Sequence, residues 1–409
     1  MKHFWIIFLA CALVISGTGC NSSVSCPAES RGSKDLMEGI EGNVVFICYD
    51  DESARSGYLN FSVGLLQQCC AAENTLLSPL SVYTALSMTA EGARGETGQQ
   101  MRACLGMPEE GWFWNFNREA LKPANAIWFT NDDRFTVNPD FLQTNADRYG
   151  AGIYSAPFDA STLRDINRWV EEQTDGMIPE ILDEIQPDAV MYLVNALAFE
   201  AEWETVYTEN QLRERDFHRE DEKTCRVEFL HGEESGYLEN DIATGFMKYY
   251  KGGDYAFVAL LPREGMTIEE FVDALDGEML KTLLDSVEYT MVDTAMPAFE
   301  AEYGADLVQS LQEMGMVLAF DPENADFSGL GTSSRGNISI NRVIHKTCIR
   351  VTSDGTRAAA ATVVEPTDAA ALVDPERKTV TLDRPFLYMI VDTQAGIPVF
   401  LGTLMNPEK

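Results

Sequence analysis

The longest continuous apolar run beyond the first twenty residues is Ala189–Trp203. A run with so few polar interruptions predicts a strand that is covered on both faces, and therefore a central strand of a sheet. Asn195 breaks the run near its middle. Because a buried amide must find hydrogen-bond partners, we expect Asn195 to belong to a polar network inside the core.

Other segments show either helical or strand-like spacing of their apolar residues. We expect helices at Tyr58–Gln68, Val82–Met88 with a start at Ser78 and Pro79, Glu96–Cys104, Pro139–Tyr149, Leu163–Thr174, Ile268–Leu275, Met279–Leu284 and Asp306–Met314. We expect strands at Asn125–Thr130, Ile153–Phe158, Lys223–Phe229, Phe246–Tyr250, Tyr255–Leu261, Tyr289–Met296, Asn337–Thr352, Phe386–Val391 and Pro398–Leu404. Phe386–Val391 lies inside a longer strand-like run, Lys378–Asp392. The two kinds of element are interspersed without a regular strand–helix–strand rhythm, which predicts an α+β fold.

A tract of small residues, Gly355–Val373, separates the last strand-like segments. One interpretation is a short surface helix, because alanine has the highest helix propensity. The other is a long exposed loop that later becomes a strand, because small side chains enter a packed sheet without steric conflict. The tract alone favours the helix, and the rest of the chain favours the loop.

The first twenty residues have the pattern of a targeting segment. A basic start precedes the apolar run Phe4–Ile15, which is shorter than a membrane-spanning helix requires. Small residues then lead to Cys20, as at a prokaryotic lipoprotein cleavage site, although Gly17 stands where such sites usually carry leucine. We expect Cys20 to carry a lipid anchor, with simple secretion as the alternative. Either way, we expect the mature protein to be extracellular or at the cell surface.

We therefore divide the chain into three parts. Residues 1–20 are a lipoprotein-like signal peptide, 21–57 are a polar tether with one apolar patch at Val44–Tyr49, and 58–409 are a single large domain. No linker-like stretch interrupts this last part.

The net charge of the chain excludes some classes of binding partner. The 409 residues include 30 basic and 65 acidic ones, which gives a formal net charge of −35. Such a charge disfavours nucleic acid and anionic membrane surfaces. We expect a monomer with no nucleic-acid partner, attached to a membrane only through a lipidated Cys20.

Site chemistry argues against an enzyme. Ser333 lies in Gly331–Arg335, which lacks the glycine that a nucleophile elbow needs after its serine. The chain has no zinc-protease, Walker or dinucleotide-binding motif. His345 follows an alternating strand and is expected to be a hydrogen-bonded core histidine. The cysteines outside the targeting segment have no metal-ligand spacing, and their pairing stays open; they are Cys26, Cys48, Cys69, Cys70, Cys104, Cys225 and Cys348. We expect no cofactor and no metal.

Taken in order, short segments of the chain resemble those of the serpin family over roughly Tyr58–Pro407. They are Asn74–Ser81, Gly92–Gly95, Ile166–Glu171 with Gly176, Val194–Phe199 with Trp203, Asp216–His218, Val343–Lys346, Gly355–Thr362, Arg384–Phe386 and Phe400–Pro407. Each segment is a weak signal, but their joint occurrence in this order is a strong one. The resemblance implies a serpin fold of three β-sheets, about eight to nine helices and an exposed reactive-centre loop.

The resemblance also implies a protease inhibitor that acts as a suicide substrate. A serine protease attacks the loop and forms an acyl-enzyme, and the cleaved loop then inserts into the main sheet as a new strand. The fourteenth residue after Gly355 is Ala369, which places the scissile bond at Ala369–Ala370. An offset loop would place it at Ala371–Leu372 or Leu372–Val373.

The family pattern assigns roles to two further sets of residues. The hinge of the loop matches Gly355, Thr356, Arg357, Ala358, Ala359, Ala360, Ala361 and Thr362. The positions that control opening of the main sheet, called shutter and breach, match Ser78, Ser81, Asn195, Trp203 and His345.

Alternate residues of an inserted strand face the core. Here they are Thr356, Ala358, Ala360, Thr362 and Val364, all small or apolar, as an inhibitory hinge requires. Burying Val364 would contribute roughly 1.5–3 kcal/mol and each alanine less, so the loop side chains alone provide a modest drive. Before cleavage we expect Thr356 near the surface, so that a Thr356→Arg variant still folds.

The loop departs from the family pattern at two positions. Arg357 replaces the usual acidic residue but lies on the outward phase, where it should be tolerated. Pro366 would remove a hydrogen-bond donor from a central strand, late in the loop.

Alanine before the scissile bond fits small-pocket proteases of the elastase or subtilisin type. Asp368 beside the bond would be poorly accepted by many of them, and the absence of a nearby basic residue argues against trypsin-like targets. Leu105–Asn117 has no basic counterpart of the polyanion-binding helix of some serpins, so we expect no heparin-type cofactor. The alternative function is that of a non-inhibitory serpin acting as a binding or surface protein.

Overall fold

The computed structural model describes residues 32–42, 51–108, 119–131, 135–150, 152–186, 189–334, 337–356 and 377–408. Within Ala189–Trp203, Met191–Phe199 form strand β6, and all nine of its residues are buried. β6 pairs antiparallel with β3 (Leu121–Thr130) on one side and parallel with β15 (Arg342–Val351) on the other. The prediction of a central strand is confirmed.

β6 belongs to an eight-stranded sheet in which β15 and β3 also have outer neighbours. The strand order is β1 (Lys34–Asp35), β5 (Gly152–Ala156), β3, β6, β15, β16 (Gly355–Thr356) and β7 (Ala201–Glu202). β13 (Phe299–Asp306) pairs antiparallel with β15 from the side away from β6. Three ion pairs bridge β13 and β15 on their exposed face: Arg342–Asp306, Lys346–Glu302 and Arg350–Glu300.

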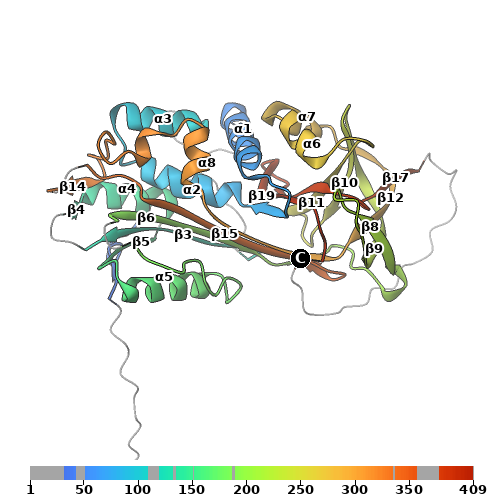
Figure 1. The fold of residues 1–409 in the computed structure, drawn as a ribbon, viewed down its shortest axis with the longest axis horizontal. Helices are drawn as coiled ribbons and strands as arrows, with labels where there is room; N and C mark the ends of the chain where they lie inside the picture. The colour runs from blue at the N-terminus through green and yellow to red at the C-terminus, as the bar shows by residue number, and fades with distance from the viewer. Residues whose placement is uncertain are drawn as a thin grey trace, which may run out of the picture. The chain divides into compact units, whose positions relative to one another are not determined.

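The two faces of this sheet pack against different cores. Alternate residues of β6, beginning with Met191 and Leu193, join the main core, whereas Tyr192, Val194 and Ala196 join a smaller cluster with α5 (Ala160–Gln173). Figure 1 shows α5 on one side of β3, β6 and β15, with α1, α2 and α3 on the other. This two-sided cover explains why β6 has an unbroken apolar sequence instead of an alternating one.

A nine-stranded sheet forms much of the remaining structure. Its order is β17 (Lys378–Thr381), β12 (Glu288–Pro297), β9 (Thr224–Glu239), β10 (Ala243–Tyr249), β11 (Tyr255–Pro262), β18 (Phe386–Asp392), β19 (Ile397–Leu404) and β2 (Thr75–Leu77), and β8 (Leu212–His218) pairs with β9. The third sheet is the pair β14 (Gly331–Ser333) and β4 (Phe135–Val137).

Eight α-helices lie in the described part of the chain, and most begin at a side-chain cap. Besides α5 they are α1 (Glu52–Cys69), α2 (Pro79–Ala90), α3 (Gly95–Leu105), α4 (Pro139–Tyr149), α6 (Ile268–Ala274), α7 (Gly277–Asp285) and α8 (Val308–Glu313). Ser78 accepts a hydrogen bond from the Ser81 N–H at the start of α2, and Pro79 supplies the first helical residue. Eight helices and three sheets agree with the expected fold class.

Several expected boundaries are wrong for identifiable reasons. Helix α1 begins at Glu52, inside the stretch assigned to the tether, because Asp51 caps it by accepting from the Ser53 and Ala54 N–H groups. The strand-like run 378–392 is two strands, since Pro385 between them cannot donate a ladder hydrogen bond, and the strand predicted at Phe386–Val391 is present as β18. The expected strand from Asn337 starts only at Arg342.

Strands β8 and β13 were not predicted, and neither were the short strands β1, β2, β4 and β14. Asp306 ends β13, so the helix expected from Asp306 starts at Val308. The patch Val44–Tyr49 lies outside the described residues. In the part of the chain that the structure describes, no helix combines the length and apolar character needed to cross a membrane.

Two glycines of α1 allow a test of its packing. A Cβ at Gly57 would overlap the Gly106 carbonyl oxygen, whereas a Cβ at Gly64 meets only the terminal Met314 methyl group at 3.3 Å. We expect Gly57→Ala to lower the free energy of unfolding by about 1–3 kcal/mol, because backbone must move. Gly64→Ala should be neutral or gain up to about 1 kcal/mol from helix propensity. Denaturant midpoints measure both, and equal effects would contradict this packing.

Candidate functional site

The candidate site lies where β6 and β15 run side by side and then separate. The two strands pair in parallel through seven register pairs, from Arg342↔Tyr192 to Cys348↔Ala198. Beyond that point β16 lies between β15 and β7, with Thr356 opposite both Val351 and Ala201. β16 is antiparallel to both neighbours, and we call the paired stretch of β6 and β15 the seam.

A tight hairpin places β16 at the end of the seam. The Thr352 N–H and hydroxyl both donate to the Gly355 carbonyl, at 2.9 and 3.0 Å. Gly355 fits here because it approaches the backbone of β7 so closely that a Cβ would overlap the Ala201 carbonyl oxygen. The hinge therefore enters the sheet at its first two residues.

The expectation that Thr356 lies near the surface is wrong. Its side chain is fully buried, and its hydroxyl shares a 2.6 Å hydrogen bond with the Tyr250 hydroxyl. A Thr356→Arg change would bury an unpaired charge in the uncleaved protein, which costs several kcal/mol. This variant is therefore expected to destabilise the uncleaved protein itself.

Trp203 holds the chain just before the hinge. Its indole Nε1–H donates to the Thr352 carbonyl and its backbone N–H to the Asp354 carbonyl, each at 2.9 Å. The Tyr207 N–H donates to the Ser353 carbonyl, also at 2.9 Å. Three donors thus bind three consecutive carbonyls and fix the turn that starts β16.

A buried ion pair lies beside Trp203. The Lys248 ammonium lies 2.7 Å from a Glu234 carboxylate oxygen and donates to the Thr205 carbonyl at 3.1 Å. The same ammonium faces the rings of Trp203 and Tyr207, at 5.3 and 4.4 Å from their centroids. Burial raises the pKa of Glu234, and the neighbouring Lys248 opposes that rise.

A row of polar side chains crosses the middle of the seam. The His345 Nδ1 lies 2.6 Å from the Asn195 Oδ1, and these two residues face each other in the β6–β15 register. The Ser78 N–H donates to the His345 Nε2 at 3.1 Å, so Nδ1 carries the proton. The Ser81 hydroxyl donates to Asn125 Oδ1 at 2.6 Å, and Asn125 pairs with Asn195 across β3 and β6.

His345 is neutral because of where it lies. Complete burial lowers the pKa of His345 to about 3. The neutral ring donates on one nitrogen and accepts on the other, which a protonated ring could not do. Protonation would therefore cost the hydrogen bond from the Ser78 N–H.

The structure brings the five residues matched to shutter and breach into two groups. Ser78, Ser81, Asn195 and His345 lie at the seam, and Trp203 lies at the hinge. Cys20, the hinge residues from Arg357 to Thr362 and the bond Ala369–Ala370 lie outside the described residues. The roles that the resemblance assigns to all these residues stay predictions.

Asn125 and Tyr250 are among the site residues that were not predicted from the sequence. Asn125 carries the same signal as Asn195, an amide in a buried strand, and could have been found by it. Tyr250 gave no such signal, because an aromatic residue at a strand end is ordinary.

Other features of the described residues offer no competing site. The described residues contain no cluster of His, Cys, Asp or Glu that could hold a metal. Among the described cysteines, Cys69, Cys70, Cys104 and Cys225 are free thiols, and the Cys348 thiol donates to the Met177 carbonyl oxygen at 3.8 Å.

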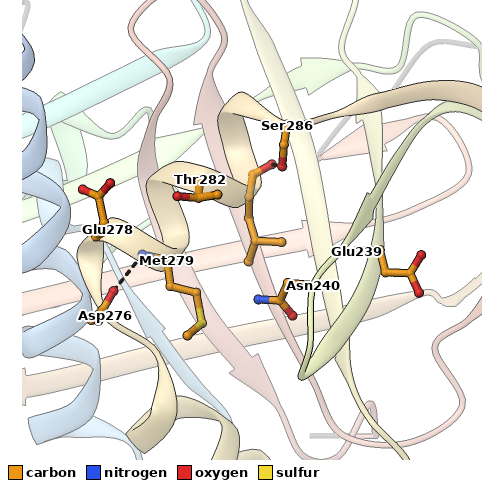
Figure 2. Close-up of a pocket in the computed structure, with 8 residues that line it drawn as sticks. Glu239, Asn240, Asp276, Glu278, Met279, Thr282 and Ser286 are labelled. Atoms are coloured by element: carbon orange, nitrogen blue, oxygen red, sulfur yellow. Dashed lines mark hydrogen bonds between the residues drawn. The ribbon is translucent and has the colours of Figure 1, made fainter.

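A pocket of about 330 Å³ lies between α7 and the β9–β10 turn, away from the seam and hinge. It is lined by Glu239, Asn240, Asp276, Glu278, Met279, Thr282, Leu283 and Ser286. Figure 2 shows the carboxylates of Glu239 and Glu278 directed away from Met279 and Asn240. The pocket thus presents an apolar floor without converging charges.

Comparison with known proteins agrees with this geometry. A family described as Serpin (serine protease inhibitor) matches residues 56–407, and the chain belongs to the serpin family. An uncharacterized serpin-like protein of Thermococcus kodakarensis is 32% identical, over 95% of this chain and 93% of its own length. The leukocyte elastase inhibitor of Bos taurus is 30% identical, over 82% and 94%. Members of this family are, in general, protease inhibitors and not enzymes.

One related serpin has been solved in two states, native and latent. The chain matches the thermophilic serpin tengpin in its native state with a TM-score of 0.86 and 40% identity, over 91% of this chain and 99% of that one. Against tengpin in its latent state the TM-score is 0.74, over 89% and 99%. The chain is therefore more similar to the native state of that serpin than to its latent state.

The buried His345 makes stability depend on pH. A neutral histidine with a folded pKa of about 3 stabilises the protein above pH 6.5, and this contribution is lost as pH falls towards 3. Between pH 7 and 5 wild type should lose about 2 kcal/mol from this source. His345→Gln, which still donates and accepts but does not titrate, should lack that loss. Chemical denaturation at both pH values measures the difference, and parallel losses in the two proteins would contradict it.

Proposed function

We propose that the protein is an extracytoplasmic serine protease inhibitor that traps its target by inserting its cleaved loop between β6 and β15. The observation that carries the proposal is β16, a strand of two residues that already lies antiparallel between two neighbours. A strand extending from Thr356 along this line would enter the seam between Ala198 and Cys348, where the pairing now ends.

The covalent step uses the protease's own chemistry. The catalytic serine oxygen attacks the Ala369 carbonyl, an ester forms, and the Ala370 nitrogen leaves with a proton as the new amine. Insertion then carries the ester-linked protease away from the loop's starting position. If insertion outpaces hydrolysis of the ester, the complex persists; if hydrolysis is faster, the inhibitor is consumed as a substrate.

The target class follows from the residues around the proposed bond. Alanine on both sides suits a small-pocket protease of the elastase or subtilisin type. The exported location and the lipid at Cys20 rest on the leader sequence, and the lipid would keep the inhibitor where extracellular proteases reach the cell.

A protease panel tests the trapping mechanism and the bond together. Incubation with elastase-like and subtilisin-like enzymes should yield a covalent complex that survives SDS, and none should form when the catalytic serine is blocked. Ala369→Arg should abolish these complexes and create one with a trypsin-like protease, because basic residues fill its pocket. Ala371→Arg serves as the positional control. Turnover without any trapped complex would support the non-inhibitory alternative.

The direction of insertion is tested by two neighbouring hinge positions. Continuing the observed register from Thr356 brings Ala358 opposite Phe199 and Ile349, both buried in the main core. Arg357 would instead come opposite the exposed Arg350. We expect Ala358→Glu to raise the number of inhibitor molecules consumed per trapped protease more than tenfold, since an unpaired buried carboxylate costs several kcal/mol.

Arg357→Glu introduces the same residue on the opposite face of the strand. It should change the number of inhibitor molecules consumed per trapped protease less than twofold. Similar values for both variants would mean that the loop does not insert in this register.

A further inference from the structure

The Tyr250 ring is held rigidly beside the start of the inserting strand. It stacks on Trp203 with ring centroids 4.4 Å apart and an angle of 15° between the planes. It also packs edge-to-face with Phe199, the last residue of β6, with ring centroids 4.9 Å apart and an angle of 70° between the planes. Both neighbours are buried, so the ring has little freedom to turn. Its hydroxyl therefore has a fixed position, and Thr356 meets it there at 2.6 Å.

We propose that Tyr250 is a positioning residue that holds the first pair of the inserting strand in place before any protease arrives. This inference rests on the proposed function and deepens it. With Gly355 and Thr356 already paired between β15 and β7, insertion extends an existing strand instead of starting from a free loop. Starting a new strand is the slow part, because the ends must be ordered before any ladder hydrogen bond forms.

The hydrogen bond is suited to this role because both of its hydroxyls are buried. Tyr250 and Thr356 are 1% and 0% exposed, so neither hydroxyl has water as an alternative partner. Removing one hydroxyl leaves the other unsatisfied, whereas removing both leaves an apolar contact of nearly the same shape. The two residues should therefore be strongly coupled in any measurement that reports on the hinge.

Tyr207 provides a matched control in the same neighbourhood. It is a buried tyrosine beside Lys248, and its hydroxyl has no hydrogen-bond partner among the described residues. Its contact with the turn is made by its backbone N–H, which substitution of the side chain preserves. Tyr207→Phe thus removes a buried hydroxyl without touching Thr356.

Hydrogen exchange tests the positioning without any protease. In Tyr250→Phe, the peptide that contains Gly355 and Thr356 should exchange about fivefold faster than in wild type, which is the effect of one ordinary hydrogen bond. Tyr207→Phe should match wild type, and peptides of β3 and β6 should be unchanged in both. Unchanged exchange at the hinge in Tyr250→Phe would overturn the proposal, even if the protein inhibits proteases normally.

Trapping kinetics then connect the hydrogen bond to function. Tyr250→Phe should raise the inhibitor consumed per trapped protease about fivefold with an unchanged rate of first encounter. Thr356→Val should do the same, Thr356→Ser should retain wild-type behaviour, and the double variant Tyr250→Phe with Thr356→Val should be no worse than either single one. Additive effects in this cycle would refute the coupling. If wild type traps no protease, the proposed function fails while the exchange experiment still decides the positioning role.

Discussion

The seam between β6 and β15 is the constraint on which the rest of the structure depends. Each strand is bound more extensively on its outer side than at the seam. β6 has nine antiparallel register pairs with β3, and β15 has eight with β13 plus three ion pairs on the exposed face. The seam has seven parallel pairs, and parallel pairing is slightly weaker per residue. Strain on these strands is therefore expected to separate β6 from β15 before it separates β6 from β3 or β15 from β13.

The polar row through the seam works against such separation. Asn195 and His345 lie in the fourth of the seven pairs, so the sheet cannot open fully without moving both. In the described structure the Asn195 Nδ2 has no hydrogen-bond partner. A buried amide that is only partly satisfied costs stability, and a rearranged sheet could supply the missing acceptor. The polar row thus holds β6 and β15 together, although the Asn195 Nδ2 group stays without a hydrogen-bond acceptor among the described residues.

The elements that depend on a local sequence pattern were predicted correctly, whereas features that depend on contacts between distant parts of the chain were missed. β6 was found because a stretch of nine residues in which Asn195 is the only polar one indicates burial on both faces. Helix starts such as Ser78–Pro79 were found because caps are local. β13 was missed although Phe299–Asp306 alternates between buried and exposed residues at its start. Thr356 was wrongly placed at the surface because its partner, Tyr250, lies 106 residues earlier in the chain, directly after strand β10 of the other large sheet.

The two ends of the seam differ, because Asn341 joins the strands at one end and Thr356 lies between β15 and β7 at the other. At one end Asn341 closes it: its Oδ1 accepts from the Val190 and Met191 N–H groups at 2.8 and 3.1 Å. At the other end β16 already separates β15 from β7. An added strand would therefore extend from the Thr356 end, reach the His345–Asn195 pair midway, and meet Asn341 last. Each step replaces one parallel pair by two antiparallel ones, so the gain in ladder hydrogen bonds grows with every residue inserted. In the proposed insertion, the buried and hydrogen-bonded Thr356 would form the first pair, which must be stable before the following pairs contribute.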